Sequence, residues 1–334
     1  MRFFEHQENA RARTTRLLLL FALTVLGLVL LVNLALALTW QLLLPSGWAY
    51  PGYFFTVNTG VTLLFVIGGW WIETSALSAG GEKLARRVGA REAWPTSRPA
   101  EQKFCNIVSE LAIAASMKAP QPMVLVRVRS INAFACGWNV GDAVLAVTEG
   151  ALDTLTRDEL QGLVAHEFSH ILEGDTRLNM RLAGMVFGLE MIFNLGRTMC
   201  QADDFRHRSI LALPGLAIMA AGSLGWLAGR ALKAAVSRQR EFLADARAIQ
   251  LTRSKEGLGG VLRKVAGQQA GADGSRPLHP SVQHMLLVAP ATGAGWFDSH
   301  PPLAERIRRI YGRPMRMLSP DAGMAEGQRT HTIF

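Results

Sequence analysis

The sequence predicts a mainly α-helical membrane protein, with four transmembrane helices and a small α+β domain. The 334 residues are 49% hydrophobic and only 18% charged. The segment from Leu17 to Ile72 contains no charged residue and no histidine, which excludes a purely soluble chain and a disordered one. Two shorter apolar stretches follow at 182–199 and 209–229, between segments of ordinary soluble composition.

The first apolar segment predicts a transmembrane hairpin. Its first run, from Leu17 to about Leu44, exceeds the roughly 20 residues that a helix needs to cross a bilayer. A turn that contains Pro and Gly precedes a second run, from about Tyr53 to Ile72, which ends at Trp70 and Trp71 as an interfacial aromatic belt would. A cleaved signal peptide does not fit, because it has about 7–15 apolar residues and no second span.

Basic residues flank this hairpin, and the turn between its arms carries no charge. By the positive-inside rule, the amino terminus and the chain after Ile72 begin in the cytoplasm. A multi-pass protein of the plasma (inner) membrane is expected. The net charge of +9 is explained by these flanks, and nucleic acid is not an expected partner. The flanking residues are Arg2, Arg11, Arg13, Arg16, Lys83, Arg86, Arg87 and Arg91.

The chain after the hairpin has the pattern of a small domain of helices and strands. An amphipathic helix is predicted from Glu101 to Met117, and β-branched runs bounded by Pro and Gly predict strands at 122–128 and 143–148. Thr156 and Glu159 form a capping box, which predicts a helix that begins there and stops near Gly174.

The two later apolar stretches predict a second hairpin. The stretch 209–229 is free of charge, whereas Glu190 and Arg197 interrupt the stretch 182–199, and a polar connection separates the two. Two buried helices of a soluble core are the alternative, because the first arm is short for a membrane span.

The motif HEFSH at 166–170 indicates the chemistry. On the predicted helix, His166 and His170 are one turn apart on one face, so both imidazoles can bind one ion. Glu167 stands beside the first ligand, where its carboxylate can take a proton from metal-bound water. This is the H-E-x-x-H arrangement of zinc peptidases, and the alternative is a solvated helix face that carries two histidines.

A catalytic zinc needs a third protein ligand and one open position. Glu241 and Asp245 are four residues apart on a predicted helix, so Glu241 can bind the ion while Asp245 holds the ring N–H of a ligand histidine. Taken alone, the pattern would be read as a salt-bridge face with Arg238, Arg240 and Arg247. The histidine pair favours the metal site instead and predicts one Zn²⁺ per chain.

With these motifs, the chain resembles the gluzincin metallopeptidases of the group that contains the HtpX membrane protease and the CAAX-prenyl (Ste24-type) endopeptidases. The match runs from about Ala119 to Gly312, with two amino-terminal spans in front as in HtpX. The matching motifs are HEFSH, the E-x-x-x-D of Glu241 and Asp245, the segment Asn132-Ala133-Phe134, and Ser299-His300-Pro301-Pro302 followed by Arg306.

The resemblance implies roles for further residues. It places Asn132, Ala133 and Phe134 in an edge strand that pairs with the substrate backbone. It also places His300 and Arg306 in the active site, facing the oxyanion that forms on the scissile carbonyl. Without the resemblance, Asn132 would be read as a turn residue and His300 as a loop residue before a helix start.

The resulting expectation is a membrane-embedded zinc metalloendopeptidase of the HtpX type, with its active site facing the cytoplasm and Glu167 as general base. Its partners would be the lipid bilayer and protein or peptide substrates, with misfolded membrane proteins as the substrates of a quality-control role. Two alternatives are a CAAX-type protease of lipidated peptides, which would need an enclosed chamber of many helices, and a non-catalytic membrane adaptor with a structural zinc site.

Six segments are expected along the chain. They are a basic cytoplasmic amino terminus (1–16), a transmembrane hairpin (17–72), the first part of a zincin-like α+β metallopeptidase domain (73–181), a second hairpin (182–229), the second part of that domain (230–313) and a carboxy-terminal tail (314–334).

Overall fold

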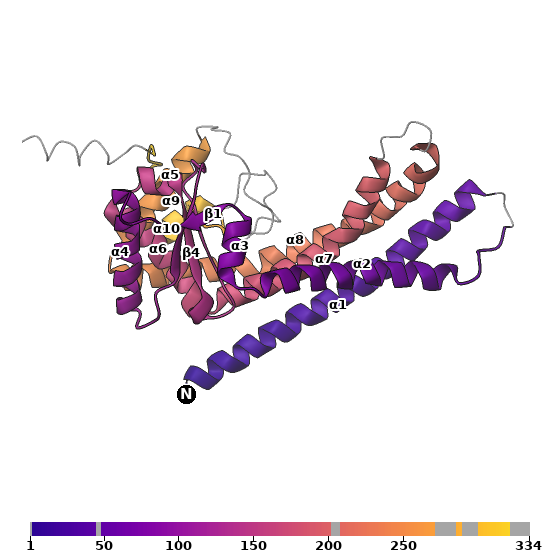
Figure 1. The fold of residues 1–334 in the computed structure, drawn as a ribbon, viewed down its shortest axis with the longest axis horizontal. Coiled ribbons are helices and arrows are strands. Elements are labelled where there is room, and N and C mark those ends of the chain that lie inside the picture. The colour runs from indigo at the N-terminus through magenta and orange to yellow at the C-terminus, as the bar shows by residue number, and fades with distance from the viewer. Residues whose placement is uncertain (1, 45–47, 202–207, 271–284, 289–299, 321–334) are drawn as a thin grey trace, which may run out of the picture. The chain divides into compact units, whose positions relative to one another are not determined.

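The computed structural model describes residues 2–44, 48–201, 208–270, 285–288 and 300–320 (Figure 1). The chain divides into two compact units, called here the helical unit and the sheet unit. The helical unit comprises Met1–Ala76 and Arg181–Lys233, and the sheet unit comprises Leu77–Met180 and Ala234–Phe334.

The helical unit is built from long apolar helices. These are α1 (Arg2–Leu43), α2 (Phe54–Leu77), and most of α7 (Asp175–Cys200) together with the first part of α8 (Arg208–Thr252). Within the described residues, three helical stretches are long and apolar enough to cross a membrane, namely Leu18–Leu43, Phe54–Leu77 and Ala212–Leu232. By length and composition, they confirm both arms of the first predicted hairpin and the second arm of the other.

The fourth predicted span is less apolar than the other three. The segment 182–199 lies inside α7, which is long enough to cross a bilayer, but this helix is not among the candidate spans of the described chain. Glu190 and Arg197 lower its mean hydropathy. The number of four spans is therefore approximate, and three are supported by composition.

α7 packs against α8 through glycines. A Cβ atom at Gly196 would overlap the backbone of Met219, and one at Gly222 would overlap the backbone of Phe193. As residue numbers rise along one helix they fall along the other, so the two helices are antiparallel neighbours. Glycine lets helix backbones approach this closely, as is common between helices in membranes.

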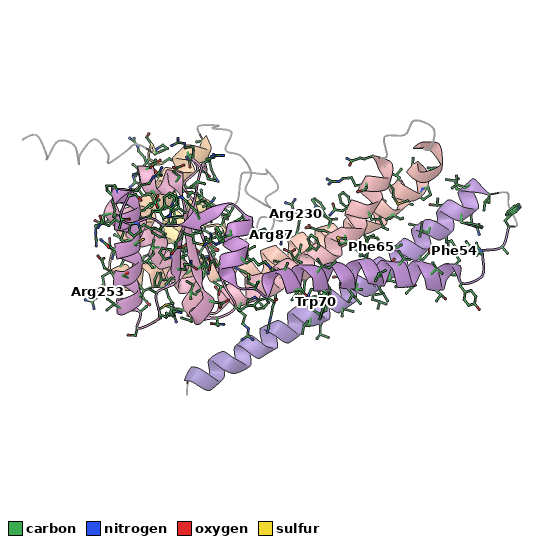
Figure 2. All side chains as sticks on the ribbon, viewed as in Figure 1. Phe54, Phe65, Trp70, Arg87, Arg230 and Arg253 are labelled. Carbon is green, nitrogen blue, oxygen red and sulfur yellow. The ribbon has the colours of Figure 1, made fainter. Side chains whose placement is uncertain are left out.

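α1, α2 and α7 share an apolar core within the helical unit. Leu28 of α1, Val66 of α2 and Leu189 of α7 are buried in one cluster. Phe65 and Trp70 of α2 pack against it (Figure 2).

The sheet unit contains one mixed sheet with the strand order β1-β2-β4-β3. β2 and β4 are parallel, the other two pairs are antiparallel, and β3 lies at one edge. The predicted strand at 143–148 is confirmed, whereas the strand predicted at 122–128 ends at Leu125. Arg127 has a φ of 63°, a left-handed conformation that a strand does not contain. The strands are β1 (Ala90–Glu92), β2 (Gln121–Leu125), β3 (Ala133–Cys136) and β4 (Val144–Thr148).

Helices pack with this sheet around one apolar core. The predicted capping box begins α6, because the Glu159 N–H donates to Thr156 Oγ1 over 3.3 Å and the Thr156 N–H donates to Glu159 Oε2 over 2.9 Å. α6 ends at Leu172, just before Gly174, whose φ is 72°. The helices are α3 (Gly81–Arg87), α4 (Pro99–Ala114), the 3₁₀ turn η1 (Val140–Asp142), α5 (Glu149–Thr154), α6 (Arg157–Leu172), α9 (Lys255–Ala270) and α10 (Leu303–Tyr311).

α6 is held against α9 by a glycine contact and a buried ion pair. A Cβ atom at Gly162 would overlap the backbone of Leu258 on α9. Nearby, Lys264 Nζ lies 2.8 Å from Glu159 Oε2, and the lysine side chain is fully buried. Both contacts lie within two turns of His166, so they fix the helix that carries the predicted metal ligands.

Gly162→Ala should separate α6 from α9, because the new methyl group has no room. Overpacking of this kind costs about 1–3 kcal/mol, so the midpoint of thermal unfolding of the detergent-solubilised protein should fall. The control is Gly60→Ala in α2, where a Cβ atom meets nothing within 4 Å and the midpoint should not fall. An unchanged midpoint in Gly162→Ala would show that this close approach does not hold the helix.

Candidate active site

Three elements of the sheet unit supply the predicted site residues. α6 carries His166, Glu167 and His170, and the last turns of α8 carry Glu241 and Asp245. His300 and Arg306 come from the start of α10 and from the residues just before it. Almost all of these side chains are buried, so the site is formed inside the fold and not on an exposed helix face.

Two imidazoles and one carboxylate converge at a single point. One ligand atom from each of His166, His170 and Glu241 lies within 4.8 Å of the others. His166 Nε2 and His170 Nε2 are 3.2 Å apart, and each lies 3.6 Å from a Glu241 oxygen. Ligands about 2.0–2.1 Å from a tetrahedral zinc are about 3.3 Å from one another, so the spacing and the donor types fit this ion.

The other ring nitrogen of each histidine faces a second carboxylate. His166 Nδ1 lies 3.1 Å from Asp245 Oδ1, and His170 Nδ1 lies 2.9 Å from Asp175 Oδ2. Such partners orient the ring and direct Nε2 toward a metal. Asp175 was not predicted from the sequence. The only indication in the sequence is that Asp175 directly follows Gly174, the residue near which the helix was expected to stop.

Glu167 is buried and differs from the other carboxylates of the site. Neither of its oxygens has a hydrogen-bond partner among the described residues. Burial raises the pKa of Glu167, and the nearby Glu241 charge adds to this rise. With His170 and Glu241, its side chain lines a small cavity. A carboxylate with a raised pKa and free oxygens is suited to accept a proton from water.

Arg306 lies beside the Glu241 carboxylate. Its side chain is fully buried, and its Nη2 and Nε lie 2.7 and 2.9 Å from the two Asp245 oxygens. Its Nη1 lies 3.1 Å from Glu241 Oε2 and donates a 2.9 Å hydrogen bond to Leu287 O. The resemblance implied that Arg306 faces the oxyanion, whereas these contacts direct the guanidinium to the carboxylates of α8.

The charges around Glu241 keep this group ionised. Burial alone would raise the pKa of Glu241, but His300 and Arg306 hold it well below its usual range. Without a metal, burial also opposes protonation of His166, yet the adjacent Asp245 and Glu241 raise the pKa of His166 to about 9. The carboxylates of Asp245 and Glu241 thus favour positive charge at His166, as the ligands of a cation site should.

His300 lies at the same site. Its Nδ1 is 3.4 Å from Glu241 Oε1, and neither ring nitrogen makes a hydrogen bond with a described residue. A buried imidazole with a free nitrogen beside a candidate metal ligand can donate to an oxygen atom that gains negative charge.

Asn132, Ala133 and Phe134 lie where β3 begins, at the edge of the sheet. Ala135 of the same strand lines the small cavity next to Glu167. The edge strand β3 and α6 are therefore neighbours at this cavity.

The comparisons with known proteins agree with this geometry. Residues 100–313 match the model of peptidase family M48. The chain is 32% identical over 278 residues to a protease HtpX homologue of Ligilactobacillus salivarius, an alignment that covers 79% of this chain and 87% of the relative. It is 33% identical over 274 residues to a protease HtpX homologue of Dictyoglomus thermophilum, with 79% and 85% covered. No solved structure matches.

Protease HtpX of Legionella pneumophila is 33% identical over 213 residues, which cover 61% of this chain and 74% of the relative. These relatives, the family match and the apolar helices agree with one another. The chain therefore belongs to peptidase family M48 and is an HtpX-like membrane metalloprotease.

Proposed function

We propose that His166, His170 and Glu241 hold one zinc ion and that Glu167 is the general base of peptide-bond hydrolysis. This proposal is supported by the convergence of two imidazole nitrogens and a carboxylate. They lie next to a buried glutamate, Glu167, whose oxygens have no hydrogen-bond partner among the described residues. When bound, zinc supplies a Lewis acid that activates water and polarises a peptide carbonyl.

Residues of the chain transfer the proton, stabilise the transition state and position the metal ligands. Glu167 accepts the proton of the attacking water and later passes it to the leaving amine. His300 donates a hydrogen bond to the carbonyl oxygen as this oxygen becomes negative, a contact that strengthens only in the transition state. Arg306 and Asp245 act through the ligands, because they hold Glu241 and His166 in place.

Glu167→Gln should keep the shape and the three ligands but abolish the base. We expect a zinc content near one per chain and a loss of casein cleavage by about 10²-fold or more. Glu241→Ala should lose both the zinc and the activity. Wild-type activity in Glu167→Gln would remove the proposed mechanism, and zinc retained by Glu241→Ala would remove the proposed ligand set.

The orientation of the site is a second part of the proposal. α7 and α8 form an antiparallel pair that returns the chain to the site, so His166 and Glu241 lie on one side of the membrane. The 26 residues of α7 span about 39 Å, enough to cross beside α8 despite Glu190 and Arg197. We place the site in the cytoplasm on the basis of the basic flanks, and we retain the six predicted segments as the domain division.

Reporter fusions test this topology directly. Fusions after Asp175 and after Thr252 should report cytoplasm, and a fusion after Tyr50 should report the opposite side. A fusion after Gln201 should also report the opposite side if α7 and α8 both cross. Opposite locations for Asp175 and Thr252 would contradict a shared metal site, whereas a cytoplasmic Gln201 would reduce the number of spans to two.

A protease anchored in a membrane by apolar helices suits membrane or membrane-proximal proteins with locally unfolded segments. We therefore propose misfolded membrane proteins as substrates in a quality-control role, in the plasma (inner) membrane. No feature of the residues that the structure describes favours the CAAX-type or adaptor alternatives.

A further inference from the structure

A short segment of the chain lies along the outer edge of β3. This segment is Met285–Val288, and its Leu286 pairs with Phe134 in an antiparallel bridge. The Leu287 N–H donates to Ala133 O over 3.0 Å. Since β4 pairs with the other side of β3, this segment occupies the edge at which a peptide substrate is proposed to bind.

Groups outside the segment hold the backbone of its last two residues. Asn132 Nδ2 donates to Val288 O over 2.8 Å, and Asn132 Oδ1 lies 3.4 Å from the Val288 nitrogen. Arg306 Nη1 donates to Leu287 O. All four backbone polar groups of Leu287 and Val288 are thus bonded by Asn132, Ala133 and Arg306. None of these contacts involves a side chain of the segment, so they could hold any extended peptide.

The segment also lies next to the chemical centre. Met285 lines the cavity that contains Glu167, His170 and Glu241. Arg306, which binds the Leu287 carbonyl, lies 3.1 Å from the Glu241 carboxylate. A peptide held in this way would place its neighbouring bonds beside the proposed metal site.

The side chains of the segment indicate which residues the site accommodates. Leu287 is 1% exposed and Val288 is 8% exposed, and both belong to the apolar core of the sheet unit. An extended peptide that replaced them would have to fill the same space. Branched aliphatic side chains do so without a cavity or a buried polar group.

We propose that Met285–Val288 is an internal occupant of the peptide-binding edge. The preferred substrate is an extended peptide with branched aliphatic residues at the positions of Leu287 and Val288, and it must displace the segment to bind. This inference rests on the proposed function. It adds a substrate class to that function, together with an internal segment that competes with the substrate for the edge of β3. The alternative is a permanent fifth strand, on which no peptide could replace Leu287.

The test measures peptide binding without turnover. A fluorescent peptide with the sequence Met-Leu-Leu-Val is titrated into zinc-loaded Glu167→Gln protein, with and without Leu287→Ala. Truncation weakens the occupant and opens a space for the peptide leucine, so the peptide should bind at least about tenfold more tightly. The matched control is Leu262→Ala, the same truncation in the same core but on α9, which should not tighten binding.

Unchanged or weaker binding in Leu287→Ala would overturn the proposal and identify the segment as a permanent strand. A second measurement uses the unmodified active site and does not depend on the folding of a variant. The kcat/KM of the wild-type protein should be at least about tenfold higher for a Leu-Val pair than for a Ser-Asp pair in the same peptide. Equal values would contradict the proposed preference. Failure of the proposed function would look different, because neither peptide would then be cleaved.

Discussion

One buried guanidinium joins the parts of the site that distant segments supply. Arg306 binds Asp245 through two nitrogens, contacts Glu241 and holds the carbonyl of Leu287. Because the guanidinium is buried, its partners must all be present; removal of one partner from a buried ion pair costs about 3–5 kcal/mol. A single group therefore contacts the Glu241 carboxylate, the Asp245 carboxylate beside His166 and the segment Met285–Val288 at the β3 edge.

The same charge distribution separates the roles of two glutamates that lie close together. Glu241 faces His300 and Arg306, which hold its pKa low, so it stays ionised and suits a cation ligand. Glu167 lies in the same buried site with a raised pKa and no described hydrogen-bond partner. Pairs of carboxyl groups whose pKa values are pushed apart in this way mark a division between electrostatic and proton-transfer roles.

Local patterns predicted much of this structure. The capping box at Thr156 correctly predicted the residue at which α6 begins, and the spacing of HEFSH correctly predicted that His166 and His170 lie together. Both features depend only on neighbours within one helix. Contacts through space were not predictable in this way. These contacts join segments that are far apart in the chain or that lie across a turn. They are the direction of the Arg306 side chain, the pairing of Asp175 with His170 and the close approach of α9 to Gly162.

The proposed zinc site has two histidine ligands, one glutamate ligand and one open position. X-ray absorption at the zinc edge of the purified protein measures the ligands directly. We expect one zinc per chain, bound by two imidazole nitrogens and by oxygens at about 2.0–2.2 Å, with no sulfur. Scattering from sulfur at about 2.3 Å, a single imidazole, or an unchanged spectrum in Glu241→Ala would contradict it.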